Sequence, residues 1–205
     1  MKRMLILIAI AAHAGVTLAK PLVPSEETLR PAVEKYLREK GHFCLGKFDW
    51  PIDVTERDRR IGTNDAVQMP VFEKLGLVSV STPENDPTVR RYELTPEGRK
   101  YYLVKKTVSL GPGEQPIDHP GDFCAATLVL DRIVKWDAPA VVDGQQRTTV
   151  TYTYKVASAA EWAHDPQVQK VFPMIHRIVD GAGRMQLMQV FAWTNHAWVA
   201  VTPGG

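Results

Sequence analysis

The feature that most constrains the fold is a pair of long alternating segments in the middle of the chain. Residues 147–156 alternate between a polar set rich in threonine and an apolar set made mainly of valine and tyrosine. A period of two with β-branched and aromatic residues is typical of a half-buried strand. Residues 123–136 show the same period, interrupted at Arg132, and Pro139 and Asp143-Gly144 are turn signals between the two segments.

These two segments predict an antiparallel pair with one apolar face. Two strands are not stable alone, so other parts of the chain must cover that face. We expect residues 128–136, 150–156, 185–193 and 198–201 to form one sheet. The helix expected over residues 168–179 should cover its apolar face, because its valine, isoleucine and phenylalanine residues recur at helical spacing.

The expected fold class is α+β, in which the C-terminal half is an antiparallel sheet with packed helices. The N-terminal half should contain a winged-helix-like helix and hairpin. A stretch dense in proline and glycine separates the two halves. The predicted organisation has four parts, namely a signal peptide (1–19), an N-terminal α+β region (20–108), a linker (109–121) and a C-terminal sheet region (122–205).

The N-terminus has the pattern of a secretory signal peptide. Lys2 and Arg3 precede an apolar run over residues 4–18, which ends in small residues and is too short for a membrane span. Cleavage after Ala19 leaves a longer apolar core than cleavage after Ala14, and we expect the former. We therefore predict a protein of the periplasm or the medium, without a stable membrane anchor. An uncleaved anchor or a buried helix is the alternative.

Charge argues against nucleic acid as a partner. Cleavage after Ala19 removes two of the 25 Lys and Arg residues and none of the 23 Asp and Glu residues, so the mature net charge is 23 − 23 = 0. Proteins that bind nucleic acid depend on basic surfaces that neutralise phosphates. The sequence therefore predicts no nucleic-acid partner.

The chain has two cysteines, Cys44 and Cys124. In an oxidising compartment, two cysteines predict one disulfide. The alternative function for Cys44 is a nucleophile assisted by His42, which would require a reduced thiol.

Residues 71–102 carry a recognisable local pattern. A segment ending in Gly76-Leu77-Val78 is followed by a polar turn region, then by Leu94-Thr95-Pro96-Glu97-Gly98. This pattern resembles the helix-plus-wing portion of winged-helix proteins such as the MarR and PadR regulators. The resemblance implies a helix ending near Gly76, a hairpin from Leu77 to Leu94 and a new helix after Thr95. With a neutral, exported chain, we expect this unit to be a scaffold and not a DNA reader.

The C-terminal half is similar to uncharacterised exported bacterial proteins, to which no established activity is attached. The similarity depends on short motifs, namely Gly121-Asp-Phe-Cys124, Lys135-Trp136, Thr151-Tyr-Thr-Tyr-Lys155, Glu161-Trp-Ala163 and Phe172-Pro173. It implies export, in agreement with the N-terminal pattern.

The catalytic and metal-binding motifs that we sought do not occur. The sequence has no glycine-rich phosphate loop, no Gly-x-Ser-x-Gly, no His-Glu-x-x-His and no Cys-x-x-Cys. The histidines are isolated, and His164-Asp165 and His176 with Asp180 are better explained as a helix cap and a surface pair. We therefore predict no catalytic, cofactor-binding or metal-binding residues and no cofactor.

Two surfaces are candidates for binding a partner. One is the end of the last hairpin with Trp193 and Trp198, because tryptophan is enriched at interfaces, although core packing is the alternative. The other is a predicted open polar strip formed by Thr149, Thr151 and Thr153. The sequence favours a non-enzymatic binding protein, inhibitor-like or immunity-like, whose partner is another exported protein. The alternatives are a periplasmic hydrolase with a scattered active site and a winged-helix DNA-binding regulator.

Overall fold

The computed structural model describes residues 23–201, and the predicted signal peptide lies outside that range. The helices among these residues are α1 (Glu26–Lys40), α2 (Glu56–Ile61), α3 (Asn64–Lys74), α4 (Pro96–Arg99), α5 (Pro166–Val171) and α6 (Pro173–Asp180). Two short 3-10 segments are η1 (Pro112–Glu114) and η2 (Glu161–His164). The strands are β1 (His42–Cys44), β2 (Ile52–Val54), β3 (Val78–Ser81), β4 (Arg90–Leu94), β5 (Tyr102–Leu103), β6 (Thr107–Leu110), β7 (Pro116–His119), β8 (Asp122–Trp136), β9 (Ala140–Val142), β10 (Gln145–Ala159), β11 (Gln186–Thr194) and β12 (Ala197–Ala200). The expected α+β class is confirmed.

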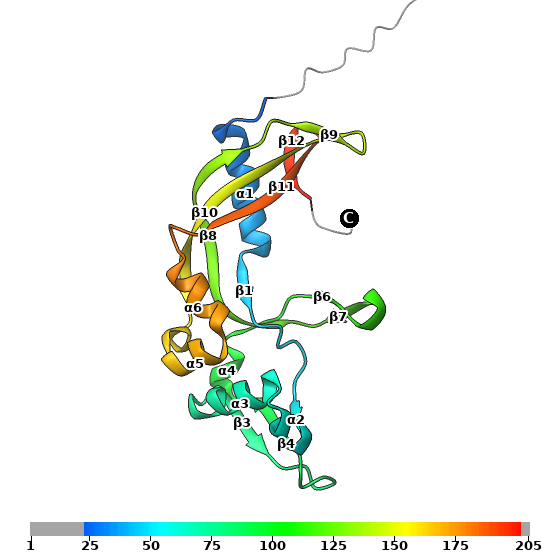
Figure 1. Cartoon of the computed structure of the whole chain (residues 1–205), viewed down its shortest axis with the longest axis vertical. Helices are drawn as coiled ribbons and strands as arrows, with labels where there is room; N and C mark the ends of the chain where they lie inside the picture. The colour runs from blue at the N-terminus through cyan, green and yellow to red at the C-terminus, as the bar shows by residue number, and fades with distance from the viewer. Residues whose placement is uncertain (1–22, 202–205) are drawn as a thin grey trace, which may run out of the picture.

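The largest element is a curled antiparallel sheet of seven strands, drawn at the top of Figure 1. Its main order is β1-β8-β10-β11-β12, while β5 pairs with β8 and β9 pairs with β10. The predicted antiparallel pair is confirmed as β8 and β10, each 15 residues long. Three register shifts interrupt their pairing. Bulges of this kind bend the strands and increase the twist, and they account for the curl.

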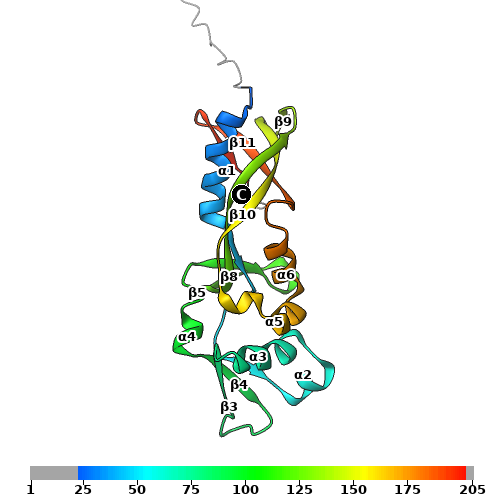
Figure 2. The same cartoon turned by 90° about the vertical axis from the view of Figure 1, so that its left-hand side faces the viewer.

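Helix α1 covers the apolar face of this sheet (Figures 1 and 2). The buried side chains of α1 are Leu29, Val33 and Leu37, and they pack in one cluster with sheet residues that include Val150 and Phe191. The prediction that residues 168–179 cover this face is wrong for most of the sheet. That segment splits into α5 and α6 at Pro173, and Ile178 of α6 packs at one end of the sheet, in a cluster with Leu128 and Tyr154. Because α1 lies about 100 residues before β10, sequence periodicity alone did not predict that the helix packs on this strand.

The lower end of the molecule in Figure 1 holds a second, three-stranded sheet in the order β2-β4-β3. The predicted hairpin between Leu77 and Leu94 is confirmed, since β3 and β4 pair from Val78↔Leu94 to Ser81↔Arg91. Thr95 caps α4 and also donates its hydroxyl proton to the Gly76 carbonyl, 2.7 Å away. A Cβ added to Gly98 would lie 2.0 Å from the Leu77 carbonyl oxygen, so the Leu-Thr-x-x-Gly pattern reflects a close backbone approach.

Residues of the two sheets share one core. The aromatic side chains of Phe72, Phe123, Trp162 and Phe172 meet at the junction, and the rings of Phe72 and Phe172 stack 5.0 Å apart. Strand β1 and helix α1, both from the predicted N-terminal region, pack on the large sheet. The chain therefore runs from the large sheet to the small sheet and back again.

The segment predicted as a linker is a hairpin that projects sideways from the middle of the molecule (Figure 1). Strands β6 and β7 pair from Thr107↔His119 to Leu110↔Pro116. We call residues 104–119 the arm. Its Pro and Gly residues lie in and beside the tip, where they form η1 and the turn, instead of forming an extended connection.

Candidate functional site

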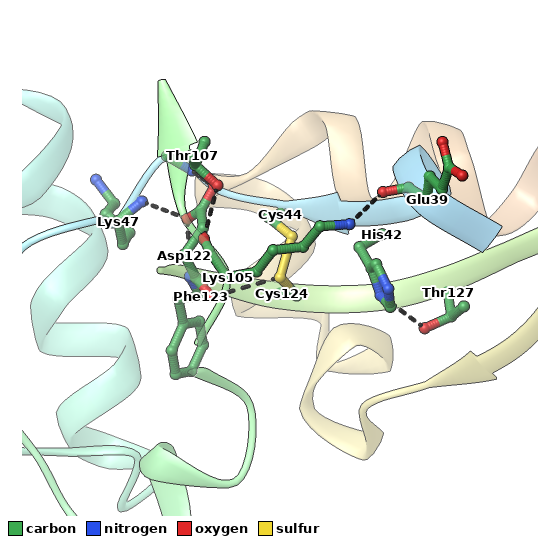
Figure 3. Close-up of a disulfide and its surroundings, with 11 residues drawn as sticks. Glu39, His42, Cys44, Lys47, Lys105, Thr107, Asp122, Phe123, Cys124 and Thr127 are labelled. Atoms are coloured by element: carbon green, nitrogen blue, oxygen red, sulfur yellow. Dashed lines mark hydrogen bonds between the residues drawn. A yellow bond between two sulfur atoms is a disulfide. The ribbon is translucent and has the colours of Figure 1, made fainter. Parts of the chain in front are cut away.

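The predicted disulfide is confirmed, since the sulfur atoms of Cys44 and Cys124 are 2.01 Å apart (Figure 3). The two cysteines are directly paired across β1 and β8. His42 Nδ1 lies 3.4 Å from Thr127 Oγ1. The oxidised sulfur has no free thiol, so Cys44 does not act as a nucleophile in this form.

Beside the disulfide, Asp122 fastens the loop after β1 to the start of β8 (Figure 3). Its carboxylate accepts hydrogen bonds from the backbone N–H groups of Gly46, Lys47 and Phe123, at 3.2, 2.9 and 2.7 Å. Burial raises the pKa of this carboxyl above its usual range, while the three N–H donors act in the opposite direction. The loop held in this way continues directly into Phe48 and Asp49.

Asp49 belongs to a chain of hydrogen bonds that joins this loop to the base of the arm. His119 Nδ1 lies 2.8 Å from Asp49 Oδ2, and His119 Nε2 lies 2.8 Å from Ser109 Oγ. Ser109 comes from β6 and His119 from β7, where both side chains lie on the same face of the hairpin. The structure thus brings together an acid, an imidazole and a hydroxyl that are far apart in the sequence.

Packing holds the His119 ring in this position. The imidazole is 8% exposed and stacks on Phe48, with ring centroids 4.1 Å apart and planes inclined by 14°. The hydroxyl of Tyr102 donates to the Phe48 carbonyl at 2.5 Å, which ties the loop to β5. Sequence analysis missed this cluster because the partners of His119, Asp49 and Ser109, are 70 and 10 residues away from it in the chain.

The arm itself is poorly covered. Its exposed large apolar side chains are Val104, Val108, Leu110 and Ile117, and Leu110 is 73% exposed. Beside them, Lys106 and Asp118 form an ion pair of 2.7 Å across the hairpin. An apolar surface with a charged border is the pattern found where proteins bind other proteins.

The tryptophan end of the last hairpin is mainly core. Trp198 is 4% exposed and packs in the cluster beneath α1, whereas Trp193 is half-buried. The two rings meet edge to face with centroids 5.4 Å apart. Trp198 is buried because β12 pairs with β11 along its whole length and its inner face points at α1. Only Trp193 retains side-chain surface for a partner.

The predicted open threonine strip is wrong. Thr153 is 1% exposed and Thr151 is also buried, while Thr149 is half-buried. The register places Thr151 between Lys135 and Met188, and it places Thr153 between Arg132 and Gln186. Directly paired residues share a sheet face, so the long side chains of these neighbours on β8 and β11 cover the short threonine side chains. The Thr153 hydroxyl also donates to Asp131 Oδ2 at 2.8 Å.

A groove of about 530 Å³ lies between the two sheets and is lined by Tyr101, Trp162 and the acidic residues Glu97, Glu161 and Asp165. Burial and the carboxylates of Glu97 and Glu161 raise the pKa of Tyr101.

Two acidic residues beside histidines have the structural roles that the sequence predicted. Asp165 caps α5, and Asp180 pairs with His176 at 3.3 Å. Among residues 23–201, no group of three or more His, Cys, Asp or Glu side chains is arranged to hold a metal ion.

Between Val23 and Val201, none of the helices combines the length and the apolar character needed to cross a bilayer. Comparison of the chain with protein-family models, with curated proteins and with solved structures found no match.

Proposed function

We propose that this chain is an exported binding protein that inserts the tip of its arm into an apolar cleft of another exported protein. The observation that carries the proposal is the arm, an anchored hairpin with uncovered apolar side chains. Inhibitor-like and immunity-like proteins would both use a surface of this kind.

The apolar surface of the arm is concentrated in a short segment. Val108 and Leu110 lie on one face of β6, and Ile117 lies on the other face of the hairpin, so both faces carry apolar groups. Hydration of such side chains is unfavourable, and each buried aliphatic side chain contributes about 1.5–3 kcal/mol. A cleft that takes both faces of the tip would bury all three.

The base of the arm is fixed before any partner arrives. The hydrogen bonds from His119 to Ser109 and Asp49, together with the stacking on Phe48, hold the hairpin on the body. A segment ordered in advance loses less conformational entropy on binding. The charges of Lys106 and Asp118 would remain at the wet border of the interface.

The segment from β2 to α4 is, in this proposal, a winged-helix-like scaffold. The order β2-β4-β3, the consecutive helices α2 and α3, and the β3–β4 hairpin support the likeness. A DNA reader would need basic side chains on the free face of α3. Here one face packs on the segment around α5, since Gln68 donates to the Val171 carbonyl at 3.1 Å and Phe72 stacks on Phe172. The helix holds one basic residue, Lys74, and two acidic residues, Asp65 and Glu73. This charge pattern favours a structural role over nucleic-acid binding.

Export completes the proposal. It is supported by the N-terminal pattern of Lys2, Arg3 and the apolar run, and by a disulfide of the kind that persists in oxidising compartments. The intact mass of the protein recovered from the periplasm or medium tests it. A mass that corresponds to residues 20–205 is expected, and a full-length cytoplasmic species would contradict it.

The binding role is tested with a photo-crosslinking amino acid placed at Leu110, with Val141 as the matched control. Both side chains are about equally exposed, at 73% and 75%, but Val141 lies on β9 at the far end of the large sheet. We expect one exported protein to be linked from position 110 and not from position 141.

The linked protein is then purified and its affinity measured. Leu110→Asp should weaken binding by about 100-fold, since a charge replaces a buried aliphatic group at the centre of the interface, whereas Val141→Asp should leave the Kd unchanged. Equal effects of the two variants, or crosslinks only from position 141, would show that the arm is not the binding surface.

A further inference from the structure

We propose that Ser109, His119 and Asp49 also form a nucleophilic site that hydrolyses small, unhindered carboxylic esters. The activity would belong to the free protein, because Ser109 lies between the tip residues Val108 and Leu110 and pairs with Ile117, so that a bound partner would cover it. Ser109 and His119 would contact the substrate, and Asp49 would act as a positioning residue.

The two ring nitrogens of His119 face different partners, Asp49 and Ser109. An ionised carboxylate only accepts hydrogen bonds, so the His119 nitrogen that faces Asp49, Nδ1, must carry a proton. In neutral His119 the other nitrogen, Nε2, then has a free lone pair, and it is this atom that lies 2.8 Å from Ser109 Oγ. The serine hydroxyl therefore donates to the imidazole. This is the orientation in which a histidine acts as a general base toward a serine.

The surroundings maintain this orientation. The His119 ring is buried, and stacking on Phe48 opposes a rotation that would exchange its two nitrogens. The loop that carries Asp49 is held by Asp122 at Gly46 and Lys47, while the Asp49 side chain itself is 67% exposed.

Ser109 is also reachable from solvent. It is half-buried in β6, and within the described residues its hydroxyl makes one side-chain hydrogen bond, that to His119. The half-exposed side chain of Ile117, its direct partner across the hairpin, offers an apolar wall for a short acyl group. An open site of this kind suits small esters with a good leaving group, which need little further stabilisation.

The reaction proceeds in two balanced steps. Ser109 Oγ attacks the ester carbonyl carbon while its proton passes to His119 Nε2, and the bond to the leaving alkoxide breaks as that alkoxide takes the proton from Nε2. The product is an acyl-serine. A water molecule then attacks the acyl carbon, gives one proton through Nε2 to Ser109 Oγ, and releases the carboxylic acid.

The first experiment uses diisopropyl fluorophosphate on the full mature protein. The Ser109 oxygen displaces fluoride from phosphorus, and the serine proton leaves with the fluoride through His119. We expect a mass increase of one diisopropylphosphoryl group located on Ser109, absent from Ser109→Ala and retained in Ser79→Ala, an exposed serine on β3. No labelling, or labelling that persists in Ser109→Ala, overturns the proposal.

The second experiment measures hydrolysis of p-nitrophenyl acetate. His119→Gln should lower the rate about 100-fold, as expected for loss of a general base, while His164→Gln, at an exposed histidine, should leave it unchanged. Asp49→Asn should lower kcat with little change in KM, and Asp49→Glu should restore part of it. An unchanged rate in His119→Gln, or no difference between Asn and Glu at position 49, contradicts the assignment.

A third variant tests the site without replacing His119, which also holds the arm on the body. Because both natural cysteines are in the disulfide, Ser109→Cys introduces a single free thiol. A thiol beside an imidazole base is more readily deprotonated, so iodoacetamide should alkylate it on the order of tenfold faster than the thiol of Ser79→Cys. Equal or slower alkylation at position 109 would show that His119 does not activate this position.

Discussion

Two antiparallel strand pairs of this protein differ in whether their apolar side chains are covered. The β8–β10 pair is long, curled and covered by α1, so that Val150, Tyr152 and Phe191 are part of a buried cluster. The β6–β7 pair has four residues in each strand and is left uncovered, so that Val108 and Leu110 face solvent. Both pairs carry apolar residues, and strand pattern alone does not distinguish them.

The difference shows what converts an apolar strand into core. A long strand pair with bulges bends far enough to surround a helix, and α1 contributes Leu29, Val33 and Leu37 to the enclosed space. The arm is too short to bend around a cover and is fixed near its base, by His119 and by Lys105, which donates to the Glu39 carbonyl. The apolar side chains of the covered pair therefore stabilise the fold, while those of the arm are available for recognition.

The largest expected effect comes from the disulfide, which fastens the edge strand β1 to the covered pair. Replacing both Cys44 and Cys124 by serine should lower the free energy of unfolding by about 4.5 kcal/mol, because the cross-link closes a loop of 80 residues. Urea unfolding of the double variant measures this, and fully reduced wild-type protein should behave in the same way. A loss below about 1 kcal/mol would show that the cross-link does not constrain the unfolded chain.

A smaller effect separates the covered pair from the arm directly. Trp198→Ala should cost about 3–4 kcal/mol, since the indole is 4% exposed and its removal leaves a cavity beneath α1. Leu110→Ala should change stability by less than about 0.5 kcal/mol, because that side chain is already solvated. Thermal and urea unfolding of the two variants provide the comparison. Similar losses in both would mean that the arm is packed as core and would remove the basis of the proposed function.

The smallest effect concerns the outer face of the covered pair. Thr153→Val should lower stability slightly at neutral pH, because a part-buried hydrogen bond to Asp131 is lost. The Thr153 hydroxyl, followed by Lys155, holds the pKa of Asp131 below its usual range. The stabilisation is thus present above the pKa of an unfolded aspartate and disappears as the pH falls through the lowered folded-state value.

Urea unfolding as a function of pH measures this difference between the wild type and Thr153→Val. The difference in unfolding free energy between the two proteins should become smaller as the pH falls into the acid range. A constant difference from neutral pH to the acid limit of folding would show that the ionised Asp131 carboxylate is not the partner that matters.

Local pattern predicted much of the fold. The alternation of residues 147–156 correctly indicated an antiparallel strand with Tyr152 and Tyr154 on the inner face. The segment around Gly76 and Thr95 correctly indicated a helix followed by a hairpin. Exposure on the outer face was predicted wrongly because the burial of Thr151 and Thr153 depends on the length of the side chains in neighbouring strands.

The sequence by itself determined the directions in which side chains leave each strand, the start of helix α5 at Asp165, and the pairing of the only two cysteines. These properties depend on neighbours along the chain or on simple chemistry. Only the tertiary structure decided that α1 covers the large sheet and that the arm is left bare. It also decided that Asp49, Ser109 and His119 meet, since Asp49 and His119 are 70 residues apart in the chain. Periodicity records which way a side chain points, but it carries no information on which distant segment will lie there.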